Sequence, residues 1–215
     1  LTTDQVSGLT TAQLRAIETR DIASLTTNQI SSIDEDNLVG LTTSQVVALT
    51  SVQIAALTTD QISAFSTANV RAMDTNQIQT LSKDQVLALG SAQLQALTTS
   101  QVAKINTDRV AAMRTSQLQA LGTSALAGMT TDQVAALTTA QVASLSTGAV
   151  AGLNTSQVNH LTSAQVAALS TTQFSALSTT LIGSVEADDV VGLTDVHLTV
   201  LGSAQVAALS NSTRS

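Results

Sequence analysis

The chain has 215 residues with 8 Lys+Arg against 15 Asp+Glu, which gives a formal net charge of −7 and a pI of about 4.4. Such an acidic chain repels nucleic-acid phosphates and anionic lipid headgroups, so neither is expected as a partner. There is no cysteine, which excludes disulfides, thiolate ligands and thiol nucleophiles. No apolar run approaches the ~18 residues that a membrane-spanning helix needs, so membrane insertion is not expected.

An eight-residue unit, L-T-T-x-Q-V-x-A, repeats in phase from Leu1 to the end of the chain. Position 1 of the unit is always apolar, and so is position 6, which first occurs at Val6. A fixed period without insertions is the signature of a repeat architecture in which neighbouring units bury a shared core. We predict one continuous octad-repeat solenoid over residues 1–208, made of 26 repeats and degenerate at 177–200, followed by a C-terminal tail at 209–215.

The first octad, LTTDQVSG, contains two helix-start signals in one frame. With Thr2 as N-cap, its hydroxyl accepts from the backbone N–H of Gln5, whose side chain reaches back to the N-cap N–H; this is a capping box. Leu1 and Val6 then occupy the two positions of a hydrophobic staple. A helix of about six residues is not stable alone in water, so each must pack on its neighbours. The predicted fold class is an all-α solenoid of very short helices.

Two other backbone conformations of the octad are less consistent with its pattern than short helices. A continuous helix would place positions 1 and 6 about 140° apart, so that no single apolar stripe could form. In a plain strand the two positions would point to opposite faces. A β-solenoid with corners would relieve this conflict and is the alternative, although the octads contain few of the Gly and Asn-Gly corners that such coils favour. The number of octads in one coil, whether two, three or four, stays open.

The octad 33–40, IDEDNLVG, departs from the pattern. Its three adjacent carboxylates lack the spaced ligands and glycine of a calcium loop, so we interpret it as a solvated acidic turn with Asp34 as N-cap. Apolar residues also occur at positions 4 and 7, which are otherwise polar or Ala. Several of these along one edge would indicate contacts between subunits. The candidates are Val39, Val47, Val52, Leu87, Val191 and Val196.

Position 3 is Thr in 18 copies and Ser in four more, although a first helical residue has no intrinsic need for a hydroxyl. One interpretation is local capping or a hydrogen bond to the adjacent coil. The other is a Thr/Ser row that carries O-linked glycans or organises water along one face. The candidates for O-glycosylation are Thr3, Thr11, Thr43, Thr59, Thr99, Thr131 and Thr139.

The octads at 177–200 lose the glutamine of position 5, which becomes Leu181, Asp189 and His197. Degenerate repeats near an end usually form a cap or a docking surface, and we look there first for contacts with another chain. Asp189 and His197 have no second His or Cys beside them, so no metal site is predicted. His160 and His197 occupy different octad positions, and no nucleophile, phosphate loop or dinucleotide fingerprint is present. We expect neither an enzyme nor a cofactor.

The LTTxQVxALTTxQVxAL pattern resembles octapeptide-repeat regions of large bacterial secreted and cell-surface proteins, some of the adhesin type. This resemblance covers nearly all of residues 1–209 and implies an extracellular, non-enzymatic structural role. The leading hypothesis is a rod, surface fibre or self-assembling filament whose copies associate end to end or side by side. The alternative is an adhesin-type binding segment that presents its Thr/Ser-rich face to glycan, to a surface or to ice.

Overall fold

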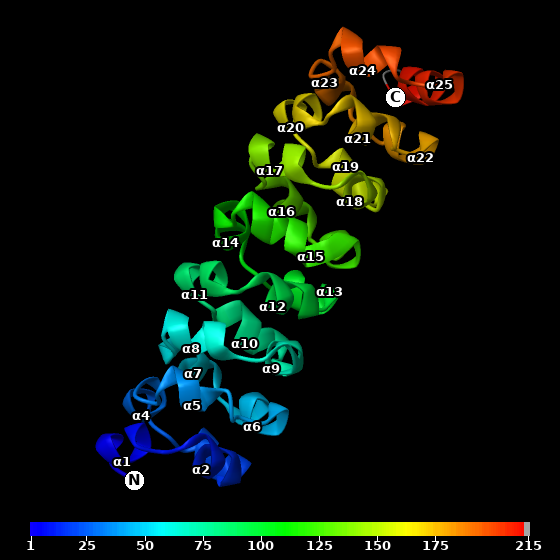
Figure 1. Cartoon of the computed structure of the whole chain (residues 1–215). Helices are drawn as coiled ribbons and strands as arrows, with labels where there is room; N and C mark the ends of the chain where they lie inside the picture. Colours follow the sequence, from blue (N-terminus) through cyan, green and yellow to red (C-terminus); the bar gives the residue numbers. More distant parts are fainter. Residues whose placement is uncertain (213–215) are drawn as a thin grey trace. The chain divides into compact units, whose positions relative to one another are not determined.

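A computed structural model describes residues 1–212 and contains 25 short α-helices and no strand within this range (Figure 1). The prediction of an all-α solenoid is therefore confirmed, and the β-solenoid alternative is wrong. Most helices span four to six residues, one per octad, as the capping frame predicts. The predicted tail at 209–215 is helical as far as Ser212, and its last three residues lie outside the described part of the chain.

The structure divides into two compact units, Leu1–Ala112 and Met113–Ser215. The octad continues in phase through both, so a single continuous solenoid stays a prediction. Unit 1 contains α1 (Thr3–Ser7), α2 (Thr11–Ala16), α3 (Thr19–Ala23), α4 (Thr27–Ser31), α5 (Glu35–Leu38), α6 (Thr43–Ala48), α7 (Ser51–Ala56), α8 (Thr59–Ala64), α9 (Thr67–Ala72), α10 (Thr75–Thr80), α11 (Lys83–Ala88), α12 (Ser91–Ala96), α13 (Thr99–Val102) and α14 (Thr107–Ala112). Unit 2 contains α15 (Thr115–Ala127), α16 (Thr131–Ala135), α17 (Thr139–Ser144), α18 (Thr147–Ala151), α19 (Thr155–Asn159), α20 (Ser163–Ala168), α21 (Thr171–Ser175), α22 (Thr179–Ile182), α23 (Ala187–Val190), α24 (Asp195–Thr199) and α25 (Ser203–Ser212).

The capping box forms as the sequence predicts. In α7 the backbone N–H of Gln53 donates to Thr50 Oγ1 at 3.2 Å, and the Thr50 N–H donates to Gln53 Oε1 at 2.8 Å. Ser82 and Asp74 replace Thr as N-caps of α11 and α10 and keep both bonds. These bonds satisfy amide groups that a helix of five or six residues leaves without an internal partner. The octad therefore fixes where each helix begins.

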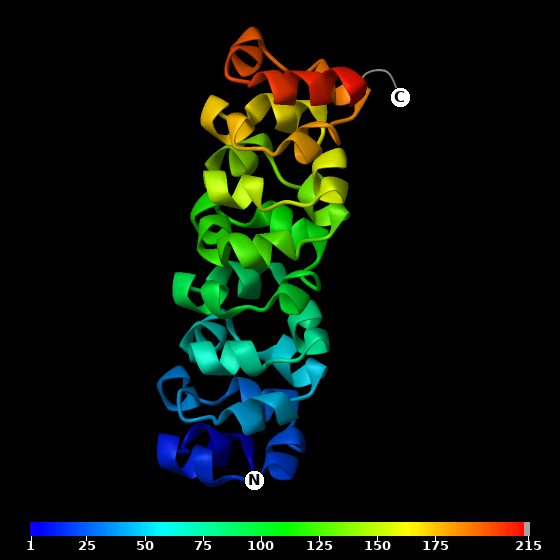
Figure 2. The same ribbon diagram turned by 90° about the vertical axis from the view of Figure 1, so that its right-hand side faces the viewer.

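Helices pack at intervals of three octads within each unit, as α7 does on α10 and α17 on α20. One coil thus takes three octads, and helices 24 residues apart stack into three columns per unit (Figures 1 and 2). In unit 1 the columns are α1–α4–α7–α10–α13, α2–α5–α8–α11–α14 and α3–α6–α9–α12. In unit 2 they are the first half of α15 with α17–α20–α23, the second half of α15 with α18–α21–α24, and α16–α19–α22–α25.

The core consists of the side chains at positions 1 and 6. Every position-6 residue from Val6 to Ile182 is at most 3% exposed, and Phe65 and Phe174 are core residues as expected. Removing this apolar surface from water is the main stabilising term, because a four- to six-residue helix contributes little by itself. In unit 2 the interior leaves a void of only about 10 Å³ among apolar side chains, which is too small for a ligand.

Two octads achieve their packing through a close approach of backbone. A Cβ on Gly40 would lie 2.6 Å from the Thr11 carbonyl oxygen, and one on Gly192 would lie 2.2 Å from that of Ser163. In both cases a glycine at position 8 lies against the backbone of the position-3 residue in the octad three repeats earlier. Their helices, α5 and α23, have only four residues each. Only glycine leaves room for this contact.

Candidate functional site

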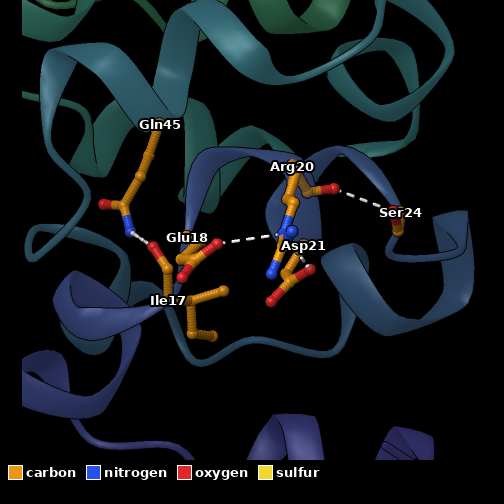
Figure 3. Close-up of polar contacts among 6 residues, drawn as sticks. All are labelled: Ile17, Glu18, Arg20, Asp21, Ser24 and Gln45. Carbon is orange, nitrogen blue, oxygen red and sulfur yellow. Dashed lines mark hydrogen bonds and ion pairs between the residues drawn. The ribbon is translucent and has the colours of Figure 1, made fainter.

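The main polar feature of the molecule is a set of hydrogen bonds that the position-5 glutamines make to the preceding coil. Figure 3 shows Gln45, whose Nε2 donates to the carbonyl oxygen of Ile17 at 2.8 Å. The same nitrogen donates to the carbonyl oxygen of Leu14, also at 2.8 Å. The side-chain Oε1 meanwhile accepts from the Thr42 N–H at 2.8 Å. The side-chain amide of this glutamine therefore caps the start of its own helix and also bonds that helix to the preceding coil.

The register of these bonds is constant. Gln77 Nε2 donates to the carbonyls of Val46 and Leu49, 31 and 28 residues earlier, at 2.8 and 2.6 Å. Gln165 repeats this in unit 2 with Val134 and Leu137, at 3.0 and 2.7 Å. We call this set the glutamine ladder; its members with such bonds inside one unit are Gln29, Gln45, Gln53, Gln61, Gln77, Gln85, Gln93, Gln101, Gln141, Gln157, Gln165, Gln173 and Gln205.

The ladder adds a donor for carbonyls at the C-terminal ends of short helices. The Leu14 carbonyl, for example, accepts from the Ile17 backbone N–H as well as from Gln45. This role was missed by reasoning from the sequence, which assigned glutamine to the capping box alone. A signal for it exists: a capping box accepts Glu as well as Gln, yet position 5 never contains Glu. A carboxylate has no hydrogen to donate and would face carbonyl oxygens, whereas an amide has both an acceptor and a donor and serves both purposes.

Other residue types replace glutamine in three octads and keep a bond to the preceding coil. Asn69 Nδ2 donates to the Leu41 carbonyl at 3.2 Å, and the Arg109 guanidinium donates to the Gln79 carbonyl at 2.6 Å. Asn37 does the reverse, since its Oδ1 accepts from both the N–H and the hydroxyl of Thr11, at 3.2 and 3.1 Å. Several types of side chain therefore preserve the hydrogen bond between coils.

His197 is a fourth replacement and the clearest. Its Nε2 lies 2.7 Å from the Leu169 carbonyl oxygen, 28 residues earlier, and its Nδ1 lies 3.2 Å from the Thr194 nitrogen. A carbonyl can only accept and an N–H can only donate, so the imidazole takes the neutral tautomer with its hydrogen on Nε2. The buried ring also packs against Phe174, with centroids 5.2 Å apart. His197 thus reproduces both bonds of a ladder glutamine.

In unit 1, the residues predicted as subunit contacts do not lie along one edge. Val39 and Leu87 belong to the same column, on α5 and α11, with α8 between them, and Leu87 is half-buried. Val47 and Val52 belong to the other two columns, on α6 and α7. In unit 2, Val191 and Val196 are exposed, and so are three further apolar side chains, Leu198, Val200 and Val206. Whether any of these residues contacts a partner stays a prediction.

The predicted glycosylation sites differ in accessibility. Thr3, Thr43, Thr59, Thr99 and Thr139 are exposed at the first residue of their helices, whereas Thr11 and Thr131 are half-buried. The Thr11 hydroxyl donates to Asn37 Oδ1, which is the bond to the adjacent coil that the local interpretation of position 3 expects.

Acidic side chains follow one column of unit 1. Asp36, Asp60, Asp84 and Asp108 are exposed at position 4 of α5, α8, α11 and α14, which stack successively at 24-residue steps. Each carboxylate lies in the first turn of its helix, where the positive end of the backbone dipole favours it. The octad 33–40 begins this column, with Asp34 Oδ1 accepting from the Asp36 N–H as the predicted N-cap.

An open hollow of about 600 Å³ lies beside α3, between Leu1, Ile17, Leu25 and Gln29. Figure 3 shows the charged side chains on this helix: Arg20 Nε lies 2.9 Å from a Glu18 carboxylate oxygen and 3.5 Å from one of Asp21. All three side chains are well exposed, so these ion pairs contribute little to stability. Within residues 1–212, no group of three His, Asp or Glu side chains could hold a metal ion.

No helix of the described chain is both long enough and apolar enough to span a bilayer. A comparison with curated protein sequences gives no match. The family model described as "ALTTAQ repeat" matches seven times in overlapping stretches, at residues 14–51, 30–67, 54–91, 71–107, 110–147, 139–171 and 147–179. These stretches cover far more than half of the chain, and their repeat is the one that forms the helices and the ladder. The chain therefore belongs to the ALTTAQ repeat family.

Proposed function

We propose that this chain is a structural, non-enzymatic repeat protein whose octad coils stack into a rod or filament, and that copies of it associate end to end. The observation that carries the proposal is the glutamine ladder. Each coil offers amide donors toward the preceding coil and backbone carbonyls toward the following one, so an octad coil is complementary to any other octad coil. Contacts of this head-to-tail kind extend into filaments when the rotation between successive copies does not close a ring.

Two surfaces of the described chain support end-to-end association. Leu198 and Val206 occupy position 6 but are 46% and 43% exposed, while the same position is at most 3% exposed from Val6 to Ile182. Elsewhere in the molecule, a neighbouring octad coil buries the position-6 side chains. A coil of another copy can bury Leu198 and Val206 in the same way. In the first two octads of unit 1, Gln5 and Gln13 are exposed and keep their capping bonds to Thr2 and Thr10.

The test is negative-stain microscopy and analytical ultracentrifugation of the purified chain over a range of concentrations. We expect filaments or concentration-dependent oligomers in the native chain. In Gln5→Glu/Gln13→Glu, a carboxylate can still accept the capping bond but cannot donate to a carbonyl, so association should weaken at least tenfold. The charge-matched control is Gln79→Glu/Gln95→Glu, at two exposed position-7 sites. Discrete monomers at every concentration would contradict the proposal.

The alternative function is an adhesin-type segment that presents a Thr/Ser face to glycan, to a surface or to ice, and the exposure of the five position-3 threonines favours it. Replacing Thr3, Thr43, Thr59, Thr99 and Thr139 by Val should abolish binding to a glycan array or thermal hysteresis, while leaving the circular dichroism helical. Intact-mass spectrometry of the natural protein tests O-glycosylation of the same residues.

The proposed location is extracellular, at the cell surface, on the basis of the resemblance to secreted octapeptide-repeat regions. Accessibility of the protein to an added protease in intact cells of its source tests this. Protection until the cells are lysed would contradict it.

A further inference from the structure

Octad 121–128, LGTSALAG, lacks both the N-cap hydroxyl and the position-5 glutamine of the repeat. Its N-cap is Gly122, which has φ +74° and ψ 166° and is the only positive-φ residue within residues 1–212. All capped octads have an extended N-cap with negative φ, as Thr130 does at −72° in the next octad. Glycine has no hydroxyl for the cap, and Ala125 replaces the position-5 glutamine. This octad therefore has neither a capping box nor a ladder amide.

Octad 145–152, LSTGAVAG, stacks on it in the same column, α18 against α15, and also lacks the ladder amide. Its position 5 is Ala149, which supplies no donor to the carbonyls of Leu118 and Leu121, 31 and 28 residues earlier. The neighbouring columns keep such donors: Gln141 bonds the Met113 carbonyl and Gln157 bonds the Met129 carbonyl, both at 2.7 Å. Gln157 also bonds the Ala127 carbonyl at 3.2 Å, so octad 121–128 receives a ladder amide from the next column but none from octad 145–152.

The contact between these two octads is mainly apolar. Leu121, Leu126, Ala149 and Val150 are buried there, and the methyl group of Thr123 lies 3.7 Å from where a Cβ on Gly148 would stand. The α18 helix retains a serine cap, Ser146 Oγ, which accepts from the Ala149 N–H at 3.1 Å. Nearby, Gln119 Nε2 donates to the Ser144 carbonyl at 2.7 Å, but this bond is exposed to water. No buried side-chain amide is available to join this pair of octads.

We propose that the contact between residues 121–128 and 145–152 is a weak joint. At this joint, unit 2 opens locally before its other columns open. In a solenoid each coil contacts only its neighbours, so opening begins at the weakest contact between coils. The remaining ladder bonds of unit 2 hold the adjacent octads closed during this opening. The joint would let a stacked coil part and close again without unfolding the whole unit.

Hydrogen exchange followed by mass spectrometry on the full chain tests the joint. Backbone amides in 121–128 and 145–152 should exchange about tenfold faster than those in 129–144 and 161–168, because a missing buried hydrogen bond lowers the cost of local opening. Equal exchange rates in the four segments would overturn the proposal. This measurement needs no variant and does not depend on any change in folding.

A repair variant provides the second arm. Ala149→Gln places an amide in the ladder register of Leu118 and Leu121, and exchange in 145–152 should slow toward that of 137–144. The matched control is Ala143→Gln, an exposed position-7 site of the same unit, which should leave the exchange pattern unchanged. Slowing of 145–152 by the control as much as by the repair would overturn the assignment of the joint to the missing amide.

Discussion

Octads 161–168 and 185–192 pack on each other as α20 and α23, yet they join their neighbours in different ways. The first has Thr162 as a bonded cap and Gln165 in the ladder. The second has Glu186 at the N-cap with no side-chain cap bond, and Asp189 at position 5. It compensates by bringing Gly192 against the backbone of Ser163. Coils can therefore be joined by a buried amide or by close backbone packing, and the following variants separate the two.

The largest loss is expected from Gln165→Leu, which keeps the side-chain volume but removes the ladder bond. The Leu137 carbonyl and the Thr162 N–H lose their ladder partner, while the Val134 carbonyl keeps its bond from the Leu137 N–H. Each buried unpaired group costs roughly 1–3 kcal/mol. We expect the free energy of unfolding in urea, followed by circular dichroism, to fall by about 3 kcal/mol. Gln95→Leu, at an exposed position 7, is the control; a similar loss there would contradict the role of the ladder.

Gly192→Ala tests the second kind of contact. The new Cβ would lie 2.2 Å from the Ser163 carbonyl oxygen, so the two coils must separate. We expect a loss of about 2 kcal/mol, the range of overpacked sites. Gly202→Ala is the comparison, because its nearest neighbour, Gln205 Oε1, would be 3.7 Å away. Equal thermal unfolding midpoints for the two variants would show that the close approach does not matter.

Thr162→Ala should have a smaller effect. It removes the hydroxyl that accepts from the Gln165 N–H at 3.3 Å but leaves the ladder amide in place. The expected cost is about 1 kcal/mol, as for other N-caps. Thr162→Ser retains the acceptor and should unfold at nearly the same urea concentration as the native chain. A loss as large as that of Gln165→Leu would mean that the cap also positions the amide.

His197→Gln is expected to change the least, within about 0.5 kcal/mol, because glutamine can make the same two bonds to Thr194 and Leu169. His197→Leu removes both and should cost about 2 kcal/mol. Urea unfolding of the pair makes the comparison. If both variants lose the same amount, the ring contact with Phe174, rather than the hydrogen bonds, holds octad 193–200 in place.

Local features were predictable from the sequence because they depend on residues three to five apart. The capping box of Thr50 and Gln53 is an example, and so is the burial of positions 1 and 6. The bond from Gln53 to the Leu25 carbonyl was not predictable, since it joins atoms 28 residues apart and requires the coil length. The sequence indicates degeneration of the repeat at His197, although the imidazole makes the same bonds as a ladder glutamine.

The octad pattern predicts that a short helix begins after each position-2 cap, that the core is built from positions 1 and 6, and that the octads must stack. These conclusions follow from capping chemistry and from the need of a short helix to bury its apolar residues. The number of octads in a coil, the distribution of the exposed valines of unit 1 over different columns, and the glutamine bonds between coils emerge from the folded structure. Those features depend on which distant octads come together, and a repeat leaves this choice open because most octads offer their neighbours a similar surface.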